Sequence, residues 1–244
     1  MKKRPFHILS IDFDYFQKTT EELLATCYPD GHDLSTDISK LIWMGYYSDP
    51  KTANKMKQIR CDNQKVNQVI RTLLKQPDIR NIPIMAVNSH KHIVPFIEDI
   101  CLTAPYEPLH VTNLDMHHDA FYSDKSLNCG NWVIYLFTHY TKFQYTWVQN
   151  SISDELYPIK NAYVKAHTKI TKDLTSALNH HFDAIFLCRS DIWLPPHLDT
   201  DFAELLSSFS KINKQLYTTS DISVPRDMTR LIEDYKKCAK SPLL

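Results

Sequence analysis

Glycine is scarce in this chain, since Gly31, Gly45 and Gly130 are the only three among 244 residues. Walker-type phosphate loops and dinucleotide-binding turns need several closely spaced glycines, because the backbone must approach the ligand where a Cβ would interfere. The nucleophile elbow of α/β-hydrolases needs a glycine on each side of its serine. The sequence therefore excludes these three motifs and the mechanisms built on them.

Paired cysteines and an excess of one charge are also absent. The six cysteines form no Cys-x-x-Cys pair, which argues against a zinc finger and against a disulfide scaffold. Basic and acidic residues both number 28, so the formal net charge is zero and neither a nucleic-acid nor a membrane partner is expected. No apolar run is long enough for a membrane span, and the start lacks a signal-peptide cleavage pattern. We expect a reduced, cytoplasmic protein.

Apolar runs and helix-like segments alternate along the chain. This alternation is typical of a mostly parallel sheet with helices on both faces, so we predict an α/β fold with three layers, α/β/α. With 43% hydrophobic residues, the chain can build a substantial core, and we expect one domain over 1–244. Helical periodicity predicts one long helix within 51–76. Strands are predicted at about 7–14, 82–88, 109–115 and 183–190.

The most informative segment is the apolar run 109–114, which leads directly into Asp115, His117 and Asp119. Side chains two residues apart share one face of an extended strand, so these three are predicted to converge where the strand ends. Two carboxylates and an imidazole form a donor set suited to Mn, Fe, Co or Zn. A surface turn that happens to contain Asp and His is the alternative.

Two other predicted strands end in residues of the same kind. The segment 7–16 carries Asp12 and Asp14, whose spacing again places both carboxylates on one face. Burying two neighbouring carboxylates is costly unless a cation or hydrogen bonds compensate, although one Asp could cap the next helix instead. The apolar run 82–87 is followed by His90. Functional sites of open parallel sheets gather at the carboxyl ends of strands, so the coincidence indicates one shared site.

These segments resemble the peptide arginases, which belong to the arginase–deacetylase (ureohydrolase) superfamily. The likeness covers roughly residues 5–140 and 183–196. As in the peptide arginases, the Ser-x-Asp-x-Asp element precedes the Asp-x-His-x-Asp element, whereas ordinary arginases have the opposite order. The matching segments are IDFDYF, NSHKHIVPFI, HVTNLDMHHDAFY, GNW and FLCRSDIWLPP.

The resemblance implies an arginase–deacetylase-like fold and two Mn²⁺ ions per chain. Asp12 and Asp115 would bridge the two ions. One histidine and one aspartate would complete each ion: His90 with Asp119, and His117 with Asp14. The implied reaction is hydrolysis of arginine side chains in a ribosomally made precursor peptide, which yields ornithine and urea.

The chemistry of the residues agrees with that reaction. Two divalent cations that share carboxylates lower the pKa of a bridging water, and the resulting hydroxide can attack a guanidinium carbon. His92 and His118 are candidates for the general acid, although each could equally be a surface or supporting residue. Asn131 could orient the substrate backbone and Asp191 could pair with the guanidinium, but both also fit helix or turn caps.

Other functions fit parts of the same pattern. A Zn- or Mn-dependent deacetylase on the same fold would need only one carboxylate of the Asp-x-Asp pair, so Asp14 would be dispensable. A metal-dependent phosphoesterase and a metal-stabilised binding protein are further alternatives. In a haloacid-dehalogenase phosphatase Asp12 would be the nucleophile, but Phe16 stands where that class usually has Thr or Val. The sequence leaves the oligomeric state open, including a homo-oligomer.

Overall fold

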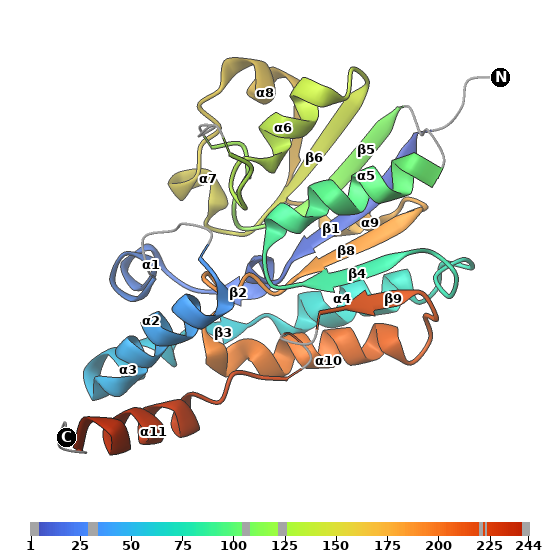
Figure 1. Cartoon of the computed structure of the whole chain (residues 1–244). Coiled ribbons are helices and arrows are strands. Elements are labelled where there is room, and N and C mark those ends of the chain that lie inside the picture. Colours follow the sequence, from blue (N-terminus) through green and yellow to red (C-terminus); the bar gives the residue numbers. More distant parts are fainter. Residues whose placement is uncertain are drawn as a thin grey trace.

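A seven-stranded sheet forms the centre of the computed structural model, which describes residues 5–28, 34–103, 108–121, 126–219, 222 and 224–240. Every neighbouring pair of its strands is parallel. In chain order the strands are β1 (Phe6–Asp12), β4 (Ile84–Val87), β5 (Leu109–Asp115), β6 (Phe143–Gln149), β7 (Thr168–Thr171), β8 (Ala184–Cys188) and β9 (Leu216–Thr218). In space the order is β7-β6-β5-β1-β8-β4-β9 (Figure 1). The four strands predicted from sequence therefore lie in one sheet.

Helices cover both faces of this sheet (Figure 1). One face packs against α5 (Ile93–Thr103), α6 (Trp132–His139) and α8 (Ala162–His167). The other packs mainly against α4 (Asn63–Leu73), α9 (Leu174–Leu178) and α10 (Asp199–Ser210). The remaining helical elements are α1 (Glu21–Cys27), α2 (Thr36–Ser48), α3 (Pro50–Met56), α7 (Ser153–Leu156), α11 (Met228–Lys240) and the 3₁₀ turns η1 (Phe13–Phe16), η2 (His90–His92) and η3 (Pro196–Leu198).

Alternation along β1 explains why both faces are apolar. Leu9 and Ile11 belong to the core on the α4 and α10 side, whereas Phe6 and Ile8 belong to the core on the α5 and α6 side. Successive strand side chains point to opposite faces, and a parallel sheet buries both of them. The predicted three-layer α/β/α fold is confirmed.

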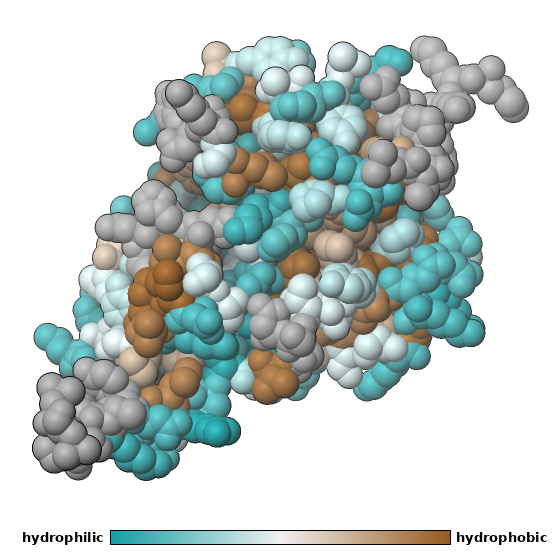
Figure 2. Space-filling model, viewed as in Figure 1, coloured by the Kyte–Doolittle hydropathy of each residue, from teal (hydrophilic) through white to brown (hydrophobic). Residues whose placement is uncertain are grey.

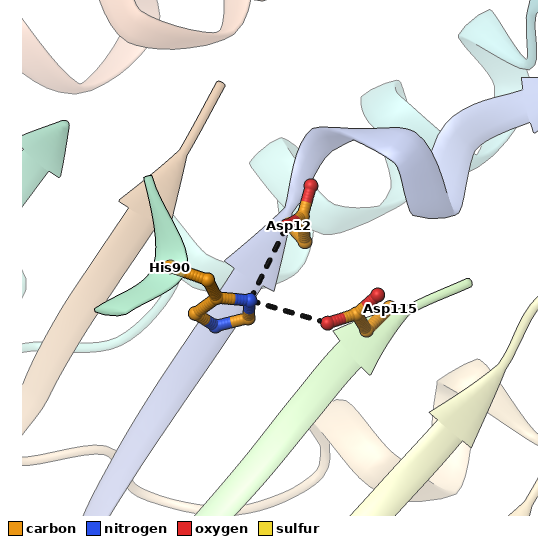
Figure 3. Close-up of side chains that lie close together, drawn as sticks. All are labelled: Asp12, His90 and Asp115. Atoms are coloured by element: carbon orange, nitrogen blue, oxygen red, sulfur yellow. Dashed lines mark ion pairs between the residues drawn. The ribbon is translucent and has the colours of Figure 1, made fainter. Parts of the chain in front are cut away.

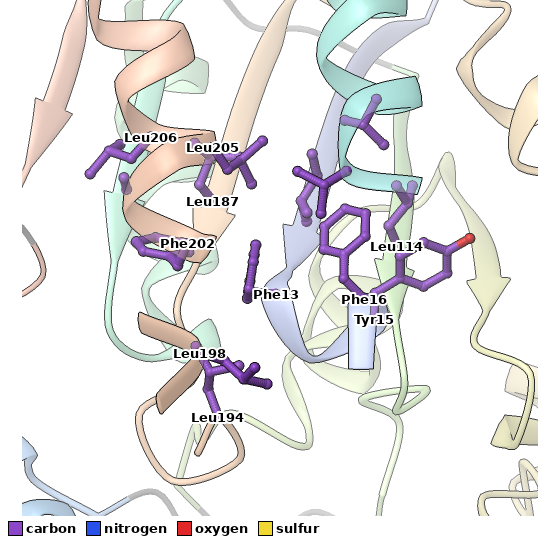
Figure 4. Packing of buried hydrophobic residues seen from close by; sticks show 14 of the residues in the cluster. Phe13, Tyr15, Phe16, Leu114, Leu187, Leu194, Leu198, Phe202, Leu205 and Leu206 are labelled. Atoms are coloured by element: carbon purple, nitrogen blue, oxygen red, sulfur yellow. The ribbon is translucent and has the colours of Figure 1, made fainter. Parts of the chain in front are cut away.

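Phe13 fixes the turn that follows β1. Its ring lies between Phe202 of α10 and Phe16, with ring-centroid distances of 5.4 and 5.3 Å (Figure 4). Full burial of such a side chain is worth about 1.5–3 kcal/mol. The carboxyl end of β1 is therefore held against α10 directly beside Asp12.

The single helix predicted within 51–76 was wrong, because the segment divides into α3, β3 (Arg60–Cys61) and α4. Asp62 causes the break: its side chain accepts from the backbone N–H of Lys65 and caps a new helix. The short strand β3 pairs antiparallel with β2 (Gln17–Lys18). Local pairing and capping thus replace two turns of the expected helix.

Polar and apolar side chains are interspersed on the face shown in Figure 2, with an apolar group over α2. Ile38 and Leu41 of that helix are 48% and 61% exposed. Within the described ranges, no helix combines the length and the apolar character that crossing a bilayer requires.

Candidate metal centre

The carboxyl ends of β1 and β5 carry the first two carboxylates. These strands are neighbours, with Ile11 paired to Leu114, so that Asp12 and Asp115 follow side by side. His90 comes from η2, just beyond β4, and reaches across β8 toward both carboxylates (Figure 3). Parallel pairing therefore assembles three side chains that are far apart in the sequence.

The first group centres on the Nδ1 atom of His90. This nitrogen lies 3.2 Å from Asp12 Oδ2, 3.2 Å from Asp115 Oδ2 and 2.9 Å from Asp119 Oδ2. All four side chains are buried. Asp12, His90 and Asp115 offer ligand atoms close enough to hold a metal ion.

The second group centres on the Nδ1 atom of His117, which lies 2.9 Å from Asp14 Oδ2 and 3.6 Å from Asp115 Oδ1. These three buried residues could also hold a metal ion. Asp115 belongs to both groups and presents a different oxygen to each. The structure therefore brings together the six residues that the sequence singled out as metal ligands.

Asp12 differs from the bridging role that the resemblance implied. Its Oδ2 approaches His90 and accepts a hydrogen bond from Ser190, while its Oδ1 accepts from the backbone N–H of Asp14. Among the contacts of the described residues, Asp12 thus joins the first group, and Asp115 alone is shared between the two groups.

The local geometry also differs from the extended strands that were predicted. β1 ends at Asp12, and Asp14 lies in the 3₁₀ turn η1. β5 ends at Asp115, so that His117 and Asp119 follow in a loop. Asp119 has a φ of 48°, in the left-handed region, which non-glycine residues rarely adopt. The ligands converge through turns rather than along one strand face.

Burial and mutual repulsion raise the pKa of two of these carboxyl groups. Burial, with the neighbouring carboxylates of Asp12 and Asp115, holds the pKa of Asp14 well above its usual range. Burial and Asp115 raise the pKa of Asp119 to about 7. Burial also acts on Asp115, but contacts with His117 and His90 hold its pKa below the usual range. The cluster concentrates negative charge that a cation would stabilise.

The pKa values of the two histidines are raised as well, but by neighbouring carboxylates rather than by burial. Burial by itself lowers the pKa of an imidazole, but Asp119, Asp115 and Asp12 outweigh it and raise the pKa of His90 well above its usual range. Asp14 and Asp115 do the same for His117. Yet His90 Nδ1 and Asp14 Oδ2 make no hydrogen bond although both are buried. Each of these atoms instead lies 2.9 Å from an atom of another candidate ligand, His90 Nδ1 from Asp119 Oδ2 and Asp14 Oδ2 from His117 Nδ1. Such closely spaced nitrogen and oxygen atoms are a donor set that fits a divalent metal ion.

A further set of side chains orients these donors. His90 Nε2 lies 2.7 Å from Ser10 Oγ, and a proton held there leaves Nδ1 free to bind a metal. Trp132 Nε1 donates to Asp119 Oδ2 at 2.5 Å, and Asn113 Nδ2 donates to Asp115 Oδ2 at 3.0 Å.

Sequence reasoning assigned these orienting residues no role. Ser10 and Trp132 do belong to segments that carry the resemblance, Ser-x-Asp-x-Asp and GNW, and this signal could have identified them.

Ser190 is the second residue with an unusual backbone. Its φ is 53°, and its hydroxyl donates to Asp12. In the described part of the chain, Ser190 and Asp119 are the only non-glycine residues with positive φ. Such a conformation costs about 1–3 kcal/mol and persists where surrounding structure enforces it. Both strained residues adjoin the candidate metal centre.

Asp191 is placed differently from the substrate role proposed for it. Both of its oxygens accept from Arg189, at 2.5 Å from Nε and 3.0 Å from Nη2, and both residues are buried. A substrate guanidinium would have to displace this bidentate ion pair, at a cost of about 3–5 kcal/mol for the charge left unpaired. The structure therefore gives Asp191 a structural partner.

The buried ion pairs extend to Arg226, which holds the loop after β8. Its guanidinium donates to both oxygens of Asp199 and to the carbonyls of Asp191 and Leu194. Ser190 sits at the start of this loop. Arg189 and Arg226 thus hold the segment directly after Ser190, the residue that contacts Asp12.

The structure also places the other three residues that the sequence suggested for substrate binding or catalysis. Asn131 is buried and braces the loop before α6, accepting from Asn128 N and donating to Ser126 O, but it makes no side-chain cap. His92 ends η2 and belongs to neither metal group. His118 is buried, its Nδ1 accepts from Ala120 N, and burial together with His117 lowers its pKa to about 4.

A low pKa changes the role expected of His118. At neutral pH its ring holds no extra proton to give, so it is a poor general acid. Because Nδ1 accepts a hydrogen bond, the neutral ring carries its proton on Nε2 and can only donate there.

Scans against protein-family models, curated proteins and solved structures found no match.

Proposed function

We propose that this protein is a Mn²⁺-dependent hydrolase that converts arginine side chains of a ribosomally made peptide to ornithine and urea. The observation that supports it best is the shared carboxylate of Asp115, which joins two buried Asp–His groups. Hydrolases that use two metal ions place them about 3.5–4 Å apart with shared ligands. When bound, such a pair would supply Lewis acidity and activate water at neutral pH.

The chain's own residues would hold this centre rigid. Ser10 orients His90, Trp132 orients Asp119, and each does so through one directed hydrogen bond. On the other side, the His117 ring packs against Tyr157 and Trp193, with centroid distances of 4.4 and 4.6 Å. Aromatic walls exclude bulk water and strengthen electrostatic contacts with a charged substrate.

The place of Asp14 favours two ions over one. It contacts His117 in a group separate from His90, and its other oxygen, Oδ1, accepts from the backbone N–H of Met116 at 3.1 Å. A deacetylase with a single ion would not need this second carboxylate. The order of the two motifs supports a peptide arginase in particular, and hydroxide attack on a guanidinium carbon suits that reaction.

Mass spectrometry of an arginine-containing peptide tests the proposal. Protein loaded with Mn²⁺ should remove the mass of cyanamide from the peptide at each converted arginine and release urea. The Asp14→Asn variant is the matched control and should lose the activity. An unchanged arginine peptide, together with cleavage of acetyl-lysine or a phosphate ester, would transfer the assignment to a deacetylase or a phosphoesterase. Turnover of free arginine without turnover of peptide would defeat the substrate claim alone.

A further inference from the structure

A cavity of about 440 Å³ lies beside the metal centre, on the side of His117. Its volume falls in the range of about 300–1,000 Å³ that is usual for small-ligand sites. Its walls come from the loop after β5, from α6, from the end of α7 and from the segment that joins α7 to α8. They include Ala120, Ile134, Leu156 and Pro158, all without charge.

Two aromatic residues connect this cavity to the metal centre. Tyr157 lines the cavity and also packs on the His117 ring, at a centroid distance of 4.4 Å. Phe121 lines it as well, lies 4.1 Å from the His118 ring and 6.5 Å from the His117 ring, and is 39% exposed. A group seated in the cavity would therefore be separated from His117 by the width of one aromatic ring.

One positive charge stands at the edge of the cavity. Lys160 is an exposed lining residue, and no carboxylate of the described chain pairs with it. Its neighbour in the wall, Asn161, is engaged in capping α8 through a bond from Val164 N. The cavity thus combines a mostly apolar lining, which also includes the His118 ring, with one cation that is available to a ligand.

We propose that this cavity binds an apolar side chain next to the target arginine in the peptide, while Lys160 contacts an acidic group of the same peptide. The inference rests on the proposed function and specifies its substrate. A free amino acid would leave the cavity empty, whereas a peptide can fill it and gain binding energy from apolar burial. The cavity would thereby favour a peptide over free arginine.

Matched peptides that differ only beside the arginine provide the test. Leucine or phenylalanine at that position should raise kcat/KM over glycine by about tenfold or more, because burying such a side chain is worth at least that factor. Leu156→Trp should fill the cavity and abolish the preference. Equal turnover of all the peptides would overturn the inference and leave the proposed function intact.

Charge reversal supplies a second, independent variant that does not depend on core packing. Lys160→Glu should lower kcat/KM for a peptide with an acidic residue near the arginine by about threefold at low salt, and less at high salt. Lys165→Glu, an exposed lysine of α8 outside the cavity, is the matched control and should change little. Equal effects of the two reversals would contradict the role of Lys160.

Binding measurements separate the two proposals if no peptide is turned over. Isothermal titration with the same leucine and glycine peptides reports the cavity without any chemistry. Tighter binding of the leucine peptide without urea release would support the cavity and refute the arginase reaction. Equal binding of both peptides would refute the cavity, whatever the turnover.

Discussion

Two clusters of histidine lie at opposite ends of β1 and β5, and they differ in burial and in the side chains around them. At the carboxyl end, His90 and His117 face four aspartates. At the amino end, His7 and His110 are paired in register and stack with centroids 4.1 Å apart. His180 adds a third ring, 5.3 Å from His7.

The side chains that contact the histidine rings distinguish the two clusters. His7 Nε2 lies 2.8 Å from Thr112 Oγ1, and His110 Nε2 lies 2.9 Å from Thr146 Oγ1. Burial, with His180 and Lys169 nearby, lowers the pKa of His110 to about 4, whereas carboxylates raise the pKa of His90. At the amino end, the two rings thus contact threonine hydroxyls, and burial with nearby basic groups keeps the His110 imidazole neutral. Only carboxylates add the charge that attracts a divalent cation.

Asp183 shows that a carboxylate near histidine is not sufficient. Its Oδ2 accepts from the backbone N–H of His7, and its Oδ1 lies 3.6 Å from the exposed His181. Within the described ranges, the grouping that could hold metal occurs at the carboxyl end alone. A site that could hold a metal ion therefore needs several carboxylates that converge on the ring nitrogens.

The largest effect is expected from removing the shared carboxylate. Asp115→Asn should abolish binding of both metal ions, because its two oxygens serve the two groups, and should lower activity by about a thousandfold or more. Asp183→Asn at the opposite end should retain the metal. Metal content per chain, measured by inductively coupled plasma mass spectrometry after dialysis, checks both variants. A full complement of metal in Asp115→Asn would show that Asp115 is not a ligand.

A smaller effect is expected from the hydroxyls that hold the two sets of rings. Ser10→Ala should weaken metal affinity by about 10–100-fold, because His90 loses the bond that fixes its ring. Thr112→Val removes the matching hydroxyl from His7 and should lower the free energy of unfolding by about 1 kcal/mol without changing metal affinity. Competition with a chelator and urea unfolding measure the two quantities. Equal metal affinity in both variants would show that the two ends do not differ in this way.

The smallest effect concerns acid stability at the amino end. The pKa of His110 falls from 6.5 to about 4 in the folded protein. Because the unfolded chain then binds a proton more readily, stability is retained above pH 6.5 and declines as the pH falls toward 4.

His110→Gln should reduce this decline in urea unfolding of chelator-treated protein, where loss of metal cannot contribute. A decline as steep in the variant as in the parent chain would assign the acid sensitivity to other groups.

The fold class and the gathering of Asp and His side chains at one edge of the sheet could be predicted because their signals are local. Apolar runs identified β1, β4, β5 and β8, and the carboxyl ends of parallel strands lie at one edge of a sheet. The spacing of Asp14 and Asp119 predicted that they lie in the cluster, but not the backbone geometry that brings them there. A 3₁₀ turn and a left-handed residue bring them into place.

The sequence by itself determined the fold class, since hydrophobic periodicity is a local property, and the types of side chain available to a metal. Only the tertiary structure decided how they are used. Ser190 donates a hydrogen bond to Asp12, which lies 178 positions away in the sequence, and Trp132 donates one to Asp119, 13 positions away. Asp191 pairs with Arg189 instead of facing the site. Such partners depend on how strands and loops pack, because a buried polar group binds whichever complementary group the fold places beside it.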